Sequence, residues 1–228
     1  GVVVDVETRT SLAGLYVAGE DAGGAHGSNR LGGNGVANST VYGGIAGDVM
    51  AADAQKMSAL HDPDETILDE ELARAIIPFS AKPGNVQELR VRLMDAMWDD
   101  VGVMRDAAGL KLGIEKIASL KTDMENVGVS ADNLAFNLSW HDWLSLQSLI
   151  DTSEVIAKAG LSRENSRGAH FREDFPDAGS LDDSYFTIAT SGDKGIEVNR
   201  EAVKFTIVKP GESLLGADEA ETLVEAAQ

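Results

Sequence analysis

A glycine-rich loop between a short apolar run and a helix of small residues constrains the fold of this chain most. Residues 14–47 read GLYVAGEDAGGAHGSNRLGGNGVANSTVYGGIAG. The apolar residues at 15–18 predict a buried strand that ends at Gly19, and residues 35–57 predict a helix. Ligands of α/β proteins bind at the carboxyl edge of the sheet, where such a loop lies. This segment is therefore the first candidate for a binding site.

Side-chain and backbone groups of this loop suit a ligand with carboxylates or hydroxyls. Glu20 comes directly after the expected strand, where an acid commonly accepts hydrogen bonds from a ribose-type hydroxyl. Arg30 carries a planar fork of five donors that fits a carboxylate. Unpaired N–H groups at the start of the helix, near Gly35, add a partial positive charge that favours an anion or an electron-rich ring edge.

Three motifs follow one another along the chain: GLYVAGE and HGSNRLGGNGV within residues 14–36, MWDDVGVMR at 97–105, and SRENSRGAHFREDFP at 162–176. Together they resemble the flavoprotein subunits of the succinate dehydrogenase and fumarate reductase family, which includes L-aspartate oxidase. The resemblance covers nearly the whole chain. It implies FAD as the cofactor and a four-carbon dicarboxylate as the substrate.

The resemblance also implies roles for single residues. Glu20 corresponds to the acid that binds the sugar-alcohol chain of the flavin. Arg30 corresponds to the arginine that holds one carboxylate of the substrate. Asn34, Gly35 and Val36 lie where the backbone of the family meets the flavin ring, and this chain has Gly35-Val36 where the family has Ser-Leu.

Histidines are the remaining candidates. His26 lies in the glycine-rich loop and is expected to contact the substrate or the flavin, without being assigned the role of proton donor. His170 lies in the charged segment 166–174, which we expect to form an ion-pair and hydrogen-bond network between the helical and flavin-binding parts. The sequence alone assigns a catalytic role to no residue of the chain. No spacing of His, Asp and Glu resembles a metal site.

The expected fold class is α+β, mostly α. Residues 1–80 are expected to be the C-terminal part of an FAD-binding α/β domain, residues 81–176 a helical domain, and residues 177–228 a small antiparallel β element with an acidic tail. Within the helical domain, apolar residues at three-to-four spacing predict a three-helix bundle with helices at 85–99, 107–125 and 138–159. A further helix is expected at 65–77.

Several segments have the composition of strands. The continuous run Val2–Val4 predicts a strand at 2–6 that is buried on both faces and belongs to the same sheet as residues 15–18. Near the other end, the β-like segments 185–190, 196–198 and 203–208 predict a hairpin or a three-stranded sheet, with a turn at 199–200.

Composition limits the class of partner and the location. The formal net charge of −19 argues against a nucleic-acid partner, because the chain would repel phosphates. The absence of cysteine excludes a disulfide, a thiolate metal site and an iron–sulfur cluster within the chain. No apolar run approaches the roughly 20 residues of a membrane span. We therefore expect a cytoplasmic protein, and the resemblance implies that it meets a membrane, at its inner face, only through partner subunits such as an anchor.

The resemblance predicts a C-terminal fragment of an FAD-dependent oxidoreductase that interconverts succinate and fumarate, or a similar dicarboxylate, by hydride transfer at flavin N5. The fragment alone is expected to be inactive, since the nucleotide-binding glycine loop and the proton-donating arginine of the family lie upstream of these motifs. Two alternatives are an L-aspartate oxidase-like activity and a non-catalytic module that docks an electron-transfer subunit. Expected partners are a dicarboxylate, an iron–sulfur electron-transfer subunit and a second copy of the chain.

Overall fold

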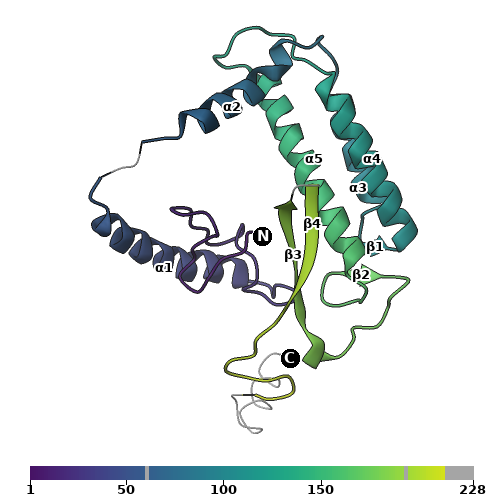
Figure 1. Cartoon of the computed structure of the whole chain (residues 1–228). Helices are drawn as coiled ribbons and strands as arrows, with labels where there is room; N and C mark the ends of the chain where they lie inside the picture. Colours follow the sequence, from purple (N-terminus) through teal and green to yellow (C-terminus); the bar gives the residue numbers. More distant parts are fainter. Residues whose placement is uncertain (60–61, 193–194, 214–228) are drawn as a thin grey trace.

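The computed structural model describes residues 1–59, 62–192 and 195–213. The long helix α1 (Asn34–Lys56) and the N-terminal segment lie on one side, and a bundle of helices lies on the other. Between them stands a β hairpin (Figure 1). The chain is mostly helical with small strands, which confirms the expected fold class.

The bundle consists of α3 (Val86–Asp99), α4 (Ala107–Glu125) and α5 (Leu138–Ser162). The three expected helices are therefore confirmed, and α5 continues to residue 162 where the prediction ended at 159. Each helix begins after a residue whose side chain accepts a hydrogen bond from a backbone N–H three residues later, which satisfies a donor that the helix leaves unpaired. These capping residues are Asn85, Asp106 and Asn137.

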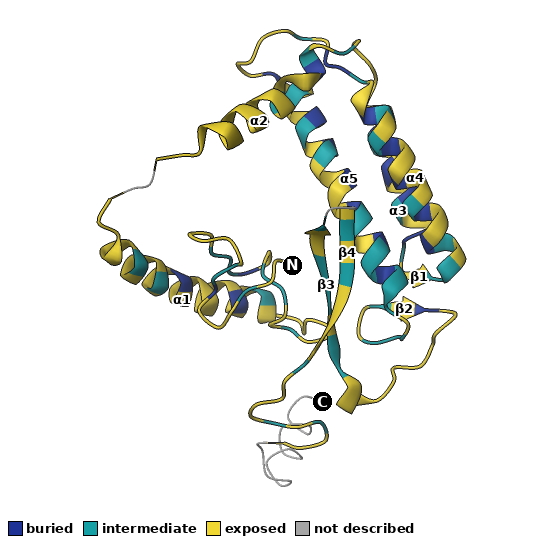
Figure 2. Ribbon diagram, viewed as in Figure 1, coloured by how far each residue is buried: buried dark blue, intermediate teal, exposed yellow. Residues whose placement is uncertain are grey.

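The hydrophobic core of the molecule lies inside this bundle (Figure 2). Leu110, Ile117 and Leu146 have no exposed surface. Trp143 belongs to the same cluster, and its Nε1 donates to the carbonyl oxygen of Val127 at 2.7 Å, so that its polar atom is satisfied within the core. Apolar side chains from all three helices thus meet as their spacing predicts.

Helix α2 (Glu65–Ile76) confirms the expected helix at 65–77, and it continues into the short 3-10 helix η1 (Ile77–Phe79). None of the residues of α2 is buried. The ring centroid of Phe79 lies 5.4 Å from that of Trp140, whose Nε1 donates to the carbonyl oxygen of Ala75 at 2.7 Å. The end of α2 and η1 therefore contact the bundle.

The expected C-terminal hairpin is confirmed, but without a third strand. After the 3-10 turn η2 (Leu181–Asp183), β3 (Tyr185–Gly192) pairs antiparallel with β4 (Gly195–Ala202). The turn predicted at 199–200 is wrong, because both residues pair with β3. The strand predicted at 203–208 is also wrong. Val203 N–H donates to the carbonyl oxygen of Ser184, but residues 203–208 form no strand. The predicted acidic tail, 216–228, lies outside the described residues.

The two strands expected near the N-terminus do not form. Only isolated bridges occur there, between Val2 and Ala22 and between Arg9 and Tyr16. Val3, expected to be buried on both faces, is 57% exposed. An apolar run becomes a sheet strand only when neighbouring strands take up its backbone groups. No such neighbours exist within the part of the chain that the structure describes.

Two sequence motifs far apart in the chain meet at the end of the bundle. The short strand β1 (Met104–Arg105) follows α3, and the short strand β2 (Phe171–Arg172) follows α5. They pair in parallel, with Arg105 opposite Arg172. The motifs at 97–105 and 162–176 thereby form one structural unit.

Candidate functional site

The N-terminus of α1 has open backbone donors. Its cap residue is Gly33, with φ of 82°, a conformation that favours glycine. No side chain caps the helix, and no acidic residue occupies its first turn. A Cβ atom at Gly32 or Gly33 would meet nothing within 4 Å. The loop and the helix start therefore leave room for a ligand to approach N–H groups that carry a partial positive charge.

Arg30 lies beside this helix start. Its side chain is exposed and makes no ion pair or hydrogen bond with other described residues. A Cβ atom added to Gly35 would lie 3.0 Å from Nη1 of Arg30, so the guanidinium rests over the position where a side chain would otherwise stand. Gly35 thus provides the space for Arg30 at the start of α1.

Asn38 connects three parts of the site and was not expected from the sequence. It is 6% exposed, and its Nδ2 donates to the carbonyl oxygen of Gly19 at 3.1 Å and contacts Nε2 of His26 at 3.1 Å. Its Oδ1 is buried without a partner among the described residues. The signal in the sequence is an amide one turn after the glycine-rich start of a helix that contains many small residues.

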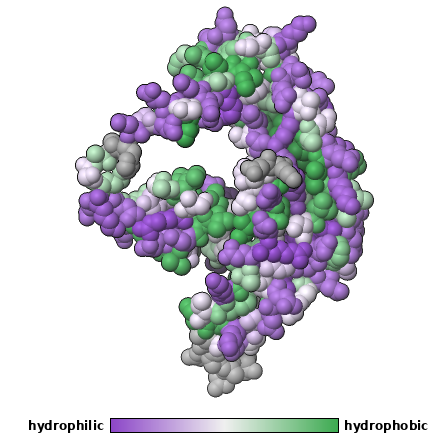
Figure 3. All heavy atoms as spheres, viewed as in Figure 1, coloured by the Kyte–Doolittle hydropathy of each residue, from purple (hydrophilic) through white to green (hydrophobic). Residues whose placement is uncertain are grey.

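The remaining sequence-predicted residues lie around the same helix start. Glu20 is exposed and follows Gly19, which packs so closely on α1 that an added Cβ would lie 2.9 Å from Oγ of Ser39. Asn34 is exposed, and Val36 is 77% exposed. In the space-filling view, hydrophobic residues reach the surface around α1 as well as over the bundle (Figure 3).

The opposite end of α1 is tied to the N-terminal segment by Asp53. Its carboxylate accepts hydrogen bonds from Tyr16 Oη at 2.7 Å and Arg9 Nη2 at 2.8 Å, and pairs with Lys56 at 3.1 Å. These donors, that of Tyr16 above all, hold the pKa of Asp53 well below its usual range. The pKa of Tyr16 is raised, first because its hydroxyl donates to this carboxylate.

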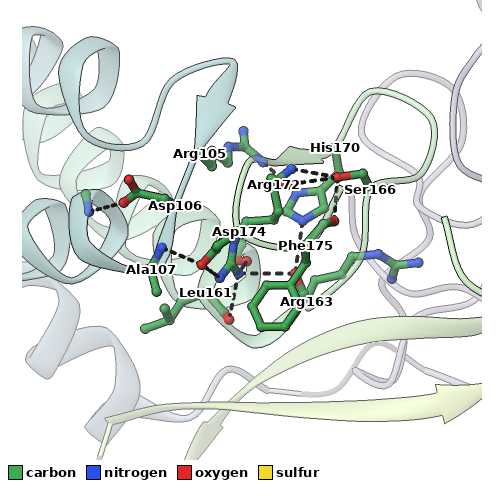
Figure 4. A network of polar contacts seen from close by, with 12 residues as sticks. Arg105, Asp106, Ala107, Leu161, Arg163, Ser166, His170, Arg172, Asp174 and Phe175 are labelled. Carbon is green, nitrogen blue, oxygen red and sulfur yellow. Dashed lines mark hydrogen bonds and ion pairs between the residues drawn. The ribbon is translucent and has the colours of Figure 1, made fainter. Parts of the chain in front are cut away.

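The charged segment at 166–174 forms the network shown in Figure 4, centred on Arg172, which is 1% exposed. Arg172 makes two 2.7 Å hydrogen bonds to the carboxylate of Asp174. It also donates to the carbonyl oxygens of Gly160, Leu161 and Arg163 at the end of α5. Arginine thus satisfies acceptors that a helix C-terminus leaves unpaired.

Asp174 extends the network to the start of α4. Its Oδ2 accepts a hydrogen bond from Ala107 N–H at 2.9 Å. The pKa of Asp174 falls to about 2, chiefly because Arg172 donates to the carboxylate. The predicted network therefore forms, but its ion pair joins the ends of α4 and α5 within the bundle.

His170 is held in its neutral form by this network. Its Nδ1 lies 2.9 Å from Nη1 of Arg105, and its Nε2 lies 3.1 Å from the carbonyl oxygen of Arg163. Since arginine can only donate, Nδ1 accepts and Nε2 carries the proton. Burial lowers the pKa of His170, and the positive charges of Arg105, Arg163 and Arg172 lower it further.

One backbone contact joins the two regions. Ala169 N–H donates to the carbonyl oxygen of Ser28 at 3.4 Å, which brings the loop of Arg30 against the turn before His170. The loop that carries His26 and Arg30 and leads into α1 is therefore supported from the bundle side, where His170 lies. A groove of about 250 Å³ lies elsewhere, on the bundle, and is lined by residues of η1, α4 and α5. None of the lining residues is a predicted site residue.

The part of the chain that the structure describes contains neither a metal-binding cluster nor a membrane-spanning helix. No three His, Cys, Asp or Glu side chains there lie together in a way that could hold a metal ion. Nor does any of its helices combine the length and apolar character needed to cross a membrane.

Comparison with known proteins adds family information. The family model for the C-terminal part of the fumarate reductase flavoprotein matches residues 90–214, and the model of an FAD binding domain matches residues 1–36. The matching subunit of the CoM/CoB fumarate reductase of Methanothermobacter marburgensis is 36% identical over 179 residues, which are 78% of this chain and 32% of the relative. L-aspartate oxidase of Yersinia pestis is 33% identical over 181 residues, 78% of this chain and 31% of the relative.

A solved structure agrees with this similarity. A variant of E. coli quinol fumarate reductase FrdA superposes with a TM-score of 0.84 at 25% sequence identity, over 93% of this chain and 37% of that chain. This chain therefore spans about a third of the length of the relatives it matches.

Proposed function

Since the chain belongs to the family of fumarate reductase and succinate dehydrogenase flavoproteins, we propose that it forms the C-terminal part of an FAD-dependent oxidoreductase acting on a four-carbon dicarboxylate. The observation that carries this proposal is Arg30, an exposed arginine that pairs with no carboxylate among the described residues and lies at the N-terminus of α1. A guanidinium that pairs with none of the described residues can bind the carboxylate of a ligand, and its positive charge offsets locally the repulsion of an anion by a chain with a net charge of −19.

Arg30 would hold one carboxylate of succinate or fumarate. Its guanidinium offers two parallel N–H donors to the two carboxylate oxygens, which fixes both the position and the orientation of the substrate. Where negative charge grows on the substrate as its double bond polarises, a fixed positive charge nearby stabilises the transition state. His26, held by Asn38, would contact the substrate or the cofactor from the same loop.

The residues at the start of α1 fit FAD. The glycines leave open space, the first turn carries no acid, and the buried amide oxygen of Asn38 has no partner among the residues that the structure describes. Glu20 would bind the sugar-alcohol chain, and the backbone of Asn34, Gly35 and Val36 would face the ring. FAD, when bound, supplies the acceptor and donor of the hydride. The helix N-terminus would favour negative charge on the ring.

The test is a conservative change at Arg30 in the gene product that contains this chain. Arg30→Lys keeps the positive charge but loses the bidentate fork, and we expect KM for fumarate to rise at least about tenfold while bound FAD stays unchanged. Arg92→Lys is the matched control, because Arg92 lies on the bundle and pairs with Asp123 at 2.7 Å. An unchanged KM in Arg30→Lys contradicts the proposed role.

A second candidate is oxidation of L-aspartate, because the oxidase of Yersinia pestis is 33% identical to this chain. Aspartate is also a four-carbon dicarboxylate, so Arg30 would serve either substrate. Activity on L-aspartate with oxygen, compared with reduction of fumarate by the same preparation, separates the two reactions.

We place the protein in an assembly with other chains, because several of its relatives are named as subunits of larger enzymes. An iron–sulfur electron-transfer subunit is the proposed partner, and this chain supplies no cysteine for such a cluster. A cytoplasmic location, at the inner face of the membrane through an anchor subunit, belongs to the same proposal. Purification of the native complex and identification of the co-purifying chains tests it.

A further inference from the structure

The loop that carries Arg30 contacts the turn at 167–170 through backbone atoms. Ala169 N–H donates to the carbonyl oxygen of Ser28 at 3.4 Å. A Cβ atom added to Gly168 would lie 2.0 Å from that oxygen and 2.5 Å from the carbonyl carbon. Real side chains do not approach backbone atoms so closely, so this contact requires glycine at position 168.

The turn is itself fixed to the bundle. Arg167 N–H donates to the carbonyl oxygen of His170 at 2.9 Å, and His170 N–H donates back to Arg167 at 3.2 Å. Gly168 has φ of 61° at the first central position, where glycine is favoured in type II′ hairpin turns. The His170 ring is held by Arg105 and by the end of α5 (Figure 4).

The Arg30 loop, by contrast, has few restraints of its own. Added Cβ atoms at Gly27, Gly32 and Gly33 would meet nothing within 4 Å, and Ser28 and Arg30 are exposed. A glycine-rich loop with few packing contacts has high conformational entropy, part of which is lost when a ligand binds. A fixed backbone contact at Ser28 reduces that entropy before the ligand arrives.

We propose that Gly168 is a positioning residue for the carboxylate-binding loop. Through Ser28, the turn at 167–170 holds Arg30 at the start of α1, so the helical part of the chain sets the place of a substrate contact on the other part. The functional consequence rests on the proposed role of Arg30; the contact itself does not. Displacement of a substrate-holding group by about 1 Å can reduce catalytic efficiency by up to a hundredfold.

Hydrogen exchange in the 228-residue chain tests the contact with a matched pair of variants. Gly168→Asn adds a side chain at Ser28, and the backbone strain of a side chain at positive φ is present in the control variant as well. Gly179→Asn is the control: its φ is 72°, and the nearest atom to an added Cβ is Arg167 Nη2 at 3.7 Å. We expect exchange at residues 27–31 to rise about tenfold in Gly168→Asn and to stay unchanged in Gly179→Asn.

A measurement without any substitution keeps the test independent of folding defects. Nuclear Overhauser effects between the α-protons of Gly168 and Ser28 are expected in the wild-type chain. Their absence, or an equal rise of loop exchange in both variants, overturns the proposal.

The functional readout uses the gene product that contains this chain. In Gly168→Asn we expect KM for fumarate to rise about tenfold with kcat within about twofold of wild type, since the loop holds substrate but does no chemistry. Faster loop exchange with an unchanged KM contradicts positioning. A wild-type product without dicarboxylate activity refutes the proposed function, while the exchange experiment still decides whether Gly168 holds the loop.

Discussion

The bundle and the N-terminal segment differ in how their structure is specified. Helices α3, α4 and α5 enclose a core in which Leu110, Ile117 and Leu146 are completely buried. In residues 1–57, only Ala46 is a buried hydrophobic residue, and Val6 is 88% exposed. Yet the N-terminal segment carries the candidate binding residues. The clearest sequence motif of the described chain therefore lies in its least packed region. Residues that bind a ligand must be accessible to it, whereas residues that form a hydrophobic core must be buried.

The largest expected effect tests whether stability resides in the bundle. Leu146→Ala should lower the free energy of unfolding by about 2–5 kcal/mol, because it leaves a cavity in the core. Val3→Ala should lower it by less than about 0.5 kcal/mol, because the side chain is largely exposed. Urea unfolding followed by circular dichroism measures both. Equal effects of the two changes contradict the distinction between the regions.

The next effect concerns the polar end of the bundle. Arg172→Lys keeps a positive charge but cannot bind Asp174 and three carbonyl oxygens at once, so we expect a loss of about 1–3 kcal/mol in the free energy of unfolding. Arg200→Lys is the control, since the side chain of Arg200 makes a single hydrogen bond with the described residues, to the carbonyl oxygen of Ser162. If the control loses as much stability as Arg172→Lys, the network does not join α4 and α5 as described.

The sequence predicted the bundle almost residue by residue, because every third or fourth apolar residue specifies which face of a helix is buried. It failed for the strand at 2–6, since a strand depends on partners that the apolar run does not encode. At the site, motif resemblance indicated Arg30 and Glu20. The roles of Asn38 and Gly168 could not be predicted, because each depends on a contact with a segment distant in the sequence.

A smaller effect concerns pH and distinguishes the polar end of the bundle from the N-terminal segment. An unfolded histidine binds a proton near pH 6.5, but burial and three arginines lower the pKa of His170 in the fold. Below pH 6.5 the unfolded state therefore binds more protons, and stability falls as pH decreases. We expect unfolding free energy to drop between pH 7.5 and 5.5, and to drop less in His170→Asn. Identical pH profiles would contradict a neutral, half-buried His170.

The smallest expected effect is local to the N-terminal segment. Asp53→Asn removes the charge that holds Arg9 and Lys56, and weakens the bond with Tyr16. Hydrogen exchange at residues 5–17 should increase, while exchange in α3–α5 should remain that of wild type, because the bundle has its own core. Faster exchange in the bundle would show that the two regions unfold together.

The most direct test of the proposed function compares this chain with the gene product that contains it, by flavin absorbance and by reduction of fumarate. We predict that the gene product is yellow and reduces fumarate, whereas the 228-residue chain alone shows no turnover, because it contributes Arg30 and part of the FAD site. A colourless gene product without activity would contradict this account and favour a non-catalytic module that docks an electron-transfer subunit.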